Sequence, residues 1–231
     1  MNKIITSIKE KIVIDENGTV TIDIKDTKEK VLIQVKENIQ AKIVVLAANT
    51  KNEIVYTIGR NAQVTVDKLV VDGSDHVYAH LFQNSSFFYN YSTINYKQNC
   101  YKIEVFHEEK NATSKVVNHG VNVENENLDF LVEGTILKDS TDSICIQDNK
   151  IICMKENHAG IKPNLMIDND KIEAEHSAYI GKLDEEELFY IMSRGIERKE
   201  ANKLLLKAFL LGDIETEENE FINIIDSIGG E

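Results

Sequence analysis

Residues 42–71 read KIVVLAANTKNEIVYTIGRNAQVTVDKLVV, and most of the chain repeats the pattern of this stretch. It holds three segments rich in Ile, Val and Thr (KIVVLA, EIVYTI and QVTVDKLVV), which are separated by the turn-formers NTKN and GRN. The centres of neighbouring segments lie about ten or eleven residues apart. Strand-like segments at this interval, with turn signals between them, predict an all-β architecture.

The same pattern continues on both sides of this stretch. Similar segments occur at 11–14, 19–24, 31–35, 102–106, 113–117, 128–132, 135–138, 143–153, 164–167 and 171–181. Residues 72–99 are richer in aromatic side chains, which we interpret as part of a β-core. A sandwich, a barrel or a β-solenoid could each produce such spacing, and strand pairs repeating at twice the interval would suit a solenoid. The spacing alone does not separate the three, and a sandwich is the most common of them.

Composition excludes several classes of protein. The 231 residues include 26 basic and 39 acidic side chains, which gives a formal charge of −13. Binding to nucleic acid or to an anionic membrane needs clustered Lys and Arg, so we expect neither partner. No stretch reaches the ~20 apolar residues that a membrane-spanning helix needs, and the N-terminus lacks a signal-peptide pattern. Three cysteines are too few for a disulfide framework, which favours a cytoplasmic protein.

Residues 177–211 differ from the rest because their apolar periodicity is helical. Asp184 can cap a first helix whose apolar stripe includes Leu188, and Gly195 can end that helix. A second helix is expected from about 198 to 211, and an acidic third helix after Thr216. Apolar helices at the end of a β-domain must bury their surface. They could pack on their own β-core or present a docking surface to a partner.

No catalytic signature occurs in the chain, which lacks G-x-S-x-G, P-loop, H-E-x-x-H and paired C-x-x-C motifs. Metal-ligand residue types gather late in the strand region, at Cys145, Cys153, His158, Glu175 and His176. Thiolate and imidazole suit iron–sulfur chemistry or zinc, and a carboxylate can complete such a site. The two cysteines also alternate with isoleucines, so buried structural thiols are the other interpretation.

A long ordered string at the strand-to-helix junction carries a family resemblance. It reads EHSAYIGKLDEEELFY at 175–190, followed by SRGI at 193–196. This string resembles the C-terminal signature of the SufB/SufD family, the scaffold proteins of the SUF iron–sulfur cluster assembly system. The resemblance extends over roughly residues 100–225 and includes the segments KPNL (162–165), ATSK (112–115) and NHG (118–120).

The resemblance implies a mainly β fold, with a right-handed parallel β-helix core over residues 1–181. It further implies a small C-terminal helical region, residues 182–231, that docks a SufC-type ABC ATPase. Two β-helix chains of this family pair through their C-terminal strands, so we expect either a homodimer or a heterodimer with another SufB/SufD-like chain. The chain would be a short, divergent member without the N-terminal helical region common in the family.

The resemblance also suggests site residues. In the family a transient iron–sulfur cluster is built at the pairing interface, and Glu175 and His176 occupy the positions of its histidine or glutamate ligands. The scaffold cysteine falls on Asp148, which Cys145 and Cys153 flank. The expected metal ligands are therefore Cys145, Cys153, Glu175 and His176. The residues expected to dock the ATPase are Asp184, Leu188, Phe189, Tyr190, Arg194, Leu204, Leu205 and Phe209.

Three functional hypotheses follow. The first is a non-enzymatic iron–sulfur cluster assembly scaffold subunit that binds the ATPase through its helices. The second is a SufD-like structural stabiliser of the scaffold complex that holds no metal. The third is a β-helix carbohydrate lyase or esterase, which would need carboxylates and basic residues clustered on one wall. The acidic strands lack the basic half of such a site.

Overall fold

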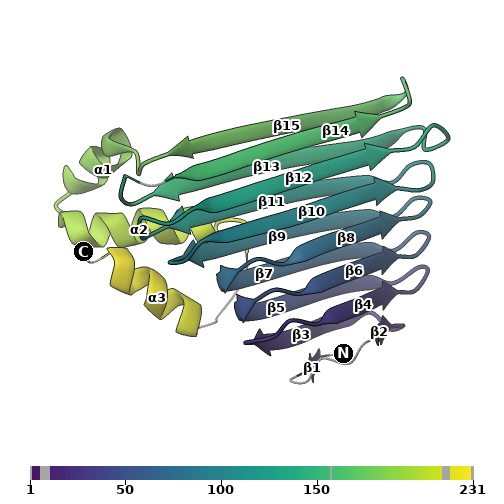
Figure 1. The fold of residues 1–231 in the computed structure, drawn as a ribbon, viewed down its shortest axis with the longest axis horizontal. Helices are drawn as coiled ribbons and strands as arrows, with labels where there is room; N and C mark the ends of the chain where they lie inside the picture. The colour runs from purple at the N-terminus through teal and green to yellow at the C-terminus, as the bar shows by residue number, and fades with distance from the viewer. Residues whose placement is uncertain (1, 6–10, 157, 215–218, 230–231) are drawn as a thin grey trace.

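The structure is a computed structural model that describes residues 2–5, 11–156, 158–214 and 219–229. Its strands form two parallel sheets (Figure 1), ordered β1-β3-β5-β7-β9-β11-β13-β15 and β14-β12-β10-β8-β6-β4-β2. Successive strands alternate between the two sheets, so each turn of the chain adds one strand to each wall. This arrangement is a parallel β-solenoid. The expected β-helix core is confirmed, and the sandwich and barrel alternatives are wrong.

The odd-numbered strands form one wall and the even-numbered strands the other. The odd strands are β1 Asn2–Ile5, β3 Gly18–Lys25, β5 Gln40–Thr50, β7 Gln63–Gly73, β9 Ser86–Asn95, β11 Thr113–Asn122, β13 Ser143–Cys153 and β15 Ile172–Gly181. The even strands are β2 Lys11–Ile14, β4 Lys30–Val35, β6 Glu53–Ile58, β8 His76–Leu81, β10 Asn99–His107, β12 Leu128–Ile136 and β14 Ala159–Ile167. Inward side chains alternate with outward ones along these strands, as the period of two requires.

A ladder of asparagines stabilises one corner of the solenoid. Asn38, Asn61 and Asn84 follow one another at intervals of 23 residues and have φ angles of 62°, 56° and 57°. Asparagine tolerates this left-handed conformation better than most residues do. The Nδ2 atoms of Asn61 and Asn84 each donate to the Oδ1 of the preceding asparagine at 3.0–3.1 Å, and Asn111 adds a further rung. The ladder therefore stacks one coil on the next at a fixed register.

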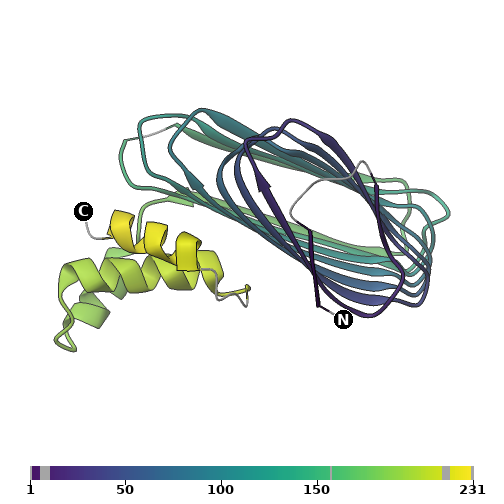
Figure 2. The same cartoon turned by 90° about the horizontal axis from the view of Figure 1, so that it is seen from below.

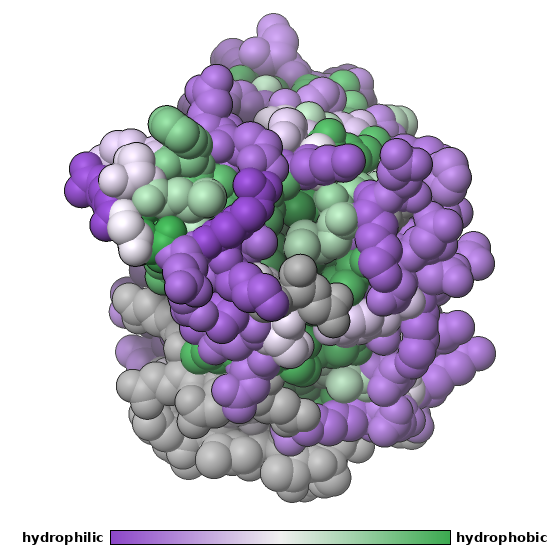
Figure 3. Space-filling model, turned by 90° about the vertical axis from the view of Figure 1, so that its left-hand side faces the viewer, coloured by the Kyte–Doolittle hydropathy of each residue, from purple (hydrophilic) through white to green (hydrophobic). Residues whose placement is uncertain are grey.

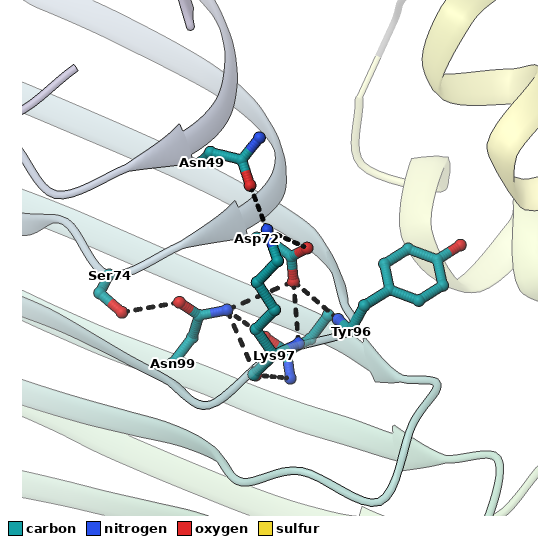
Figure 4. Close-up of polar contacts among 7 residues, drawn as sticks. Asn49, Asp72, Ser74, Tyr96, Lys97 and Asn99 are labelled. Atoms are coloured by element: carbon teal, nitrogen blue, oxygen red, sulfur yellow. Dashed lines mark hydrogen bonds and ion pairs between the residues drawn. The ribbon is translucent and has the colours of Figure 1, made fainter. Parts of the chain in front are cut away.

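A second corner is held by Asp72, which also has a positive φ of 54° (Figure 4). Its Oδ1 accepts hydrogen bonds from the backbone N–H groups of Tyr96 and Lys97, at 2.7 and 3.1 Å. The Lys97 Nζ then donates to the Oδ1 of Asn49 at 2.6 Å. Side chains and backbone of three successive coils are thus connected at this corner.

The C-terminal region forms the helices α1 Glu185–Met192, α2 Arg198–Leu211 and α3 Asn219–Gly229. Helices α2 and α3 pack on the outer face of the odd-strand sheet, near the strand ends (Figure 2). Their shared core includes Leu69, Ile94, Val121, Leu206, Leu210 and Ile225. As expected, Asp184 caps α1 and accepts from the Glu186 N–H at 2.7 Å. The expected start of the third helix, Thr216, lies outside the described residues.

Candidate functional site

The C-terminal end of the solenoid is an open coil formed by β14 and β15. These are the terminal strands of the two sheets, and each has one sheet neighbour in the described chain. Large apolar side chains are exposed there, including Met166 at 53%, Tyr179 at 52% and Ile180 at 45%. Exposed apolar surface at an unpaired strand edge is typical of an interaction surface.

Cys145 and His176 lie on the same face of neighbouring strands at this end. In the register of β13 and β15, Cys145 is beside Ala174 and Gln147 is beside His176. The inward side of this face is defined by Cys145 and Gln147, which are 1% and 2% exposed. His176 is therefore on the lumen side of the last strand and is diagonal to Cys145, at about 8 Å between side-chain origins for strands ~4.8 Å apart with a rise of ~3.3 Å per residue. The structure thus places these two expected ligands at diagonal positions on one face of neighbouring strands, at the open end of the solenoid.

The other expected ligands are placed elsewhere. Glu175 is beside Ile146 and so projects from the outer face of the sheet. Cys153 is buried at the far end of β13, eight residues from Cys145, which is about 26 Å along a strand. His158 is exposed in the segment before β14. Across the described residues, no three His, Cys, Asp or Glu side chains form a group suited to hold a metal ion.

The Cys145 thiol occupies space that a glycine provides. A Cβ on Gly134 of β12 would lie 2.5 Å from the Cys145 Sγ, so the thiol fills the place of a missing side chain. Burial raises the pKa of Cys145, and a hydrogen bond with Ser114 partly offsets this. The Ser114 hydroxyl lies 3.1 Å from the His107 Nε2, deeper in the lumen. At neutral pH Cys145 is therefore a thiol, and a bound metal would have to displace its proton.

Polar side chains also fill the lumen beside this pair. Lys68, Tyr91, Asn118 and Asn149 occupy one inward row of four successive odd strands, and all are buried. The Asn118 Nδ2 donates to the Asn149 Oδ1 at 2.7 Å, and the Asn149 Nδ2 donates to the carbonyl of Ser177 at 3.1 Å. The row thus reaches β15 next to His176. Sequence reasoning missed it, and the only signal was a polar residue at an inward position of each strand.

Asp148, at the position expected for the scaffold cysteine, faces outward. Its Oδ2 lies 2.8 Å from the Lys150 Nζ, and its Oδ1 accepts from the Ser177 hydroxyl. Partial burial alone would raise the pKa of Asp148, but the hydrogen bonds from Lys150 and Ser177 outweigh it and lower the pKa. The carboxylate is therefore ionised and already engaged. It lies on the opposite face of β13 from Cys145.

The expected docking residues divide by exposure. Phe189 and Tyr190 of α1 are 73% and 58% exposed, and Leu204 of α2 is 48% exposed. The Arg194 guanidinium, also exposed, lies 4.6 Å from the centre of the Tyr190 ring. The remaining four have structural positions, with Leu188 buried, Leu205 and Phe209 half-buried and Asp184 at the helix cap. Figure 3, which looks onto the side of the molecule that carries the helices, shows apolar surface between hydrophilic ridges.

No helix in the described ranges is both long enough and apolar enough to cross a membrane.

Comparison with known proteins identifies the family. Residues 82–209, more than half of the chain, match the family described as SUF system FeS cluster assembly, SufBD core domain. SufD of Bacillus subtilis is 31% identical over 108 residues, which are 46% of this chain and 25% of the relative. SufD of Escherichia coli is 34% identical over 62 residues, 27% of this chain and 15% of the relative.

A third relative adds to this similarity. The SufBD family protein PH1385 of Pyrococcus horikoshii is 47% identical over 58 residues, 24% of this chain and 13% of the relative. The chain thus covers a quarter or less of the length of these curated relatives. The family match itself runs from β9 through the last coils of the solenoid and almost to the end of α2. The chain belongs to the SufBD family.

Proposed function

We propose that the protein is a non-enzymatic scaffold subunit for iron–sulfur cluster assembly in a SUF system. The observation that carries the proposal is the family match, which covers both the open coil with His176 and the helices α1 and α2. Curated relatives are named iron–sulfur cluster assembly proteins. All three cysteines are free, in keeping with action in a reducing cytoplasm.

Cys145 and His176 are the residues that we propose to hold iron or a nascent cluster. A thiolate and an imidazole are ligands that iron–sulfur centres use, and the remaining ligands would come from sulfide or from a second chain. Glu175 projects from the other face of β15, where it could meet that chain. We propose Cys153 as a structural thiol, because it is buried in the core about 26 Å away.

The proposed second chain pairs at the open coil, through the edge of β15 and the apolar side chains Met166, Tyr179 and Ile180. The β14 edge is less suited to pairing, because Pro163 removes a backbone donor from it. The partner can be a second copy or another SufBD chain. A SufC-type ABC ATPase would dock on Phe189, Tyr190 and Leu204, whose exposure is difficult to account for otherwise.

Anaerobic reconstitution with ferrous iron and sulfide, followed by visible absorbance, tests the ligand assignment. We expect His176→Ala and Cys145→Ala each to reduce the cluster absorbance several-fold. Cys153→Ala is the matched control because it removes a buried thiol from the same strand. Absorbance that is unchanged in both site variants would overturn the assignment.

Titration of a purified SufC-type ATPase onto the full chain tests the docking surface. Phe189→Ala with Tyr190→Ala should weaken binding at least about tenfold, since buried aromatic anchors dominate such interfaces. Phe88→Ala is a matched control, because Phe88 is an exposed aromatic residue on β9. Equal binding by both variants would contradict docking on α1.

A non-metal stabiliser remains the second candidate, and one observation favours it. The position of the scaffold cysteine holds Asp148, whose carboxylate is already bound by Lys150 and Ser177. ATPase binding together with a failure to assemble a cluster would select this second function.

A further inference from the structure

The C-terminal end of α2 is fastened to the solenoid by side chains of the sheet. The last carbonyls of a helix lack intrahelical donors and need partners from outside. The Phe209 carbonyl accepts from the His119 Nδ1 at 2.7 Å, and the Leu210 carbonyl accepts from the Ser92 hydroxyl. One side chain on β11 and one on β9 thus supply the hydrogen-bond donors that the last carbonyls of α2 need. A third donor, the Asn90 Nδ2, reaches the Asp213 carbonyl at 3.1 Å just beyond it.

Of these three residues, His119 contacts α2 in two ways, through a hydrogen bond and through ring stacking. Its ring stacks on the Phe209 ring with the centroids 4.6 Å apart, and the side chain is 8% exposed. A carbonyl only accepts, so the Nδ1 of His119 must carry the proton. Burial lowers the pKa of His119, which keeps the ring neutral at physiological pH. The joint is therefore a buried contact with a defined tautomer.

The other end of the helical region is not held in this way. Helix α1 packs mainly on α2 and buries Leu188, and an ion pair between Arg198 and Glu185 at 2.6 Å joins the two helices. Figures 1 and 2 show α1 at the end of α2 that lies away from the strands. A helix of 14 residues is about 21 Å long. If α1 and the adjoining end of α2 move, α2 therefore acts as a lever about 21 Å long on the contact at His119.

From the joint, outward side chains lead across the sheet to β15. His119 is beside Lys150 in the register of β11 and β13. Lys150 pairs with Asp148, and Asp148 accepts from the hydroxyl of Ser177, the residue after His176. The backbone provides a second connection, because β15 ends at Gly181 and α1 begins four residues later at Glu185. The docking helices and the last strand are thus connected at two points.

We propose that His119 is a positioning residue, the fixed point about which the α1–α2 hairpin tilts and through which its displacement reaches β15 and His176. Packed elements shift between discrete arrangements instead of deforming continuously, so a tilt at this joint must be taken up by its neighbours. The inference rests on the proposed function only for the source of the force, an ATPase bound to α1. The coupling between the end of α2 and β15 involves only residues of this chain.

Hydrogen exchange of the full chain, read by mass spectrometry without ATPase or iron, tests the coupling. His119→Leu removes the donor and should speed exchange in 206–211 and in 173–180 by about two- to tenfold, the effect of losing one buried hydrogen bond. His119→Asn can donate from its amide and should restore both segments. Adding Asp148→Asn to His119→Leu should keep the α2 response and abolish the additional response of β15 relative to Asp148→Asn alone.

The outcomes separate the alternatives. A purely structural anchor would respond in α2 alone, and that result overturns the proposal. No response in either segment would mean that His119 does not hold the helix, which also overturns it. If His119→Leu speeds exchange throughout residues 42–71, global loosening obscures the readout, and the milder Phe209→Leu decides by the same two segments. Because neither iron nor ATPase is present, failure here leaves the proposed function untouched, and the converse also holds.

Discussion

The two halves of the solenoid have the same two-sheet parallel architecture and different interiors. The inward row that begins with Ile22 and Val45 continues as Lys68, Tyr91, Asn118 and Asn149. The next row begins with Val20, Ile43 and Val66 and ends with Gln147 and His176. Burying polar groups is unfavourable unless they are hydrogen-bonded. The aliphatic coils therefore supply stability, and the polar coils hold chemistry close to the open end.

The boundary between the halves should be the most sensitive position. The Asp75 Oδ2 lies 2.5 Å from the buried Lys68 Nζ, and its two oxygens also accept from Thr50 and from the Asn52 N–H. Asp75→Ala would leave a buried unpaired charge, so we expect a loss of about 3–5 kcal/mol in the free energy of unfolding, measured in urea. Lys68→Met with Asp75→Asn should recover most of it. A loss below about 1 kcal/mol from Asp75→Ala would mean that the ion pair does not support the interior.

The next largest effect should come from filling the space beside Cys145. The Cβ of Gly134→Ala would lie 2.5 Å from the Cys145 Sγ and 3.1 Å from the Gln147 Nε2. We expect this overpacking to reduce the free energy of unfolding by about 1–3 kcal/mol. In a Cys145→Ala background the same substitution should reduce it less, because the closest atom is gone. Equal losses in the two backgrounds would show that the thiol does not define this space.

A smaller effect on stability is expected from the asparagine ladder of the aliphatic half. Asn61→Ala removes two hydrogen bonds of the corner ladder and places alanine at a φ of 56°. We therefore expect a loss of about 1–2 kcal/mol in the free energy of unfolding. Asn61→Gly loses the same hydrogen bonds but accommodates the φ angle, and should be less destabilising. If alanine and glycine are equally destabilising, the backbone conformation is not the cause.

Part of this contrast could be predicted from the sequence. The alternation of residues 42–71 identified the strands, because an inward aliphatic position every second residue is a local signal. The spacing of Asn38, Asn61 and Asn84 also shows the 23-residue coil directly. The choice of a parallel solenoid came from the family resemblance, since strand spacing alone does not report which strands pair.

The candidate site was harder to predict than the strands. Cys145 and His176 occupy diagonal positions because β13 and β15 are offset by 29 residues, not by the 23 of the early coils, and that offset depends on loop length. Cys153 has the same residue type and lies in the same strand, but eight residues move it to the far end. A polar residue at a strand position such as Asn118 is equally compatible with an outward side chain, so the polar residues alone did not predict a polar interior.

The pH dependence of stability should follow the same division, with the smallest effect. Both buried histidines, His107 and His119, belong to the polar half, and burial lowers the pKa of each. The unfolded chain then binds more protons than the folded chain once pH falls below about 6.5, so their stabilisation is complete above that pH and is lost as pH falls toward the folded pKa values. Carboxylates such as Asp148, whose pKa is lowered, lose theirs only below about pH 4.

Urea unfolding between pH 7.5 and 5 should therefore show a falling free energy of unfolding. His119→Asn should reduce the slope because it removes one titrating group while retaining a donor to the Phe209 carbonyl. Protection from hydrogen exchange should weaken first over β11 and β13 and last over β5 and β7, whose interior is mostly aliphatic. Uniform weakening of both halves, or a slope that His119→Asn leaves unchanged, would contradict the assignment of this pH dependence to the polar lumen and its helix joint.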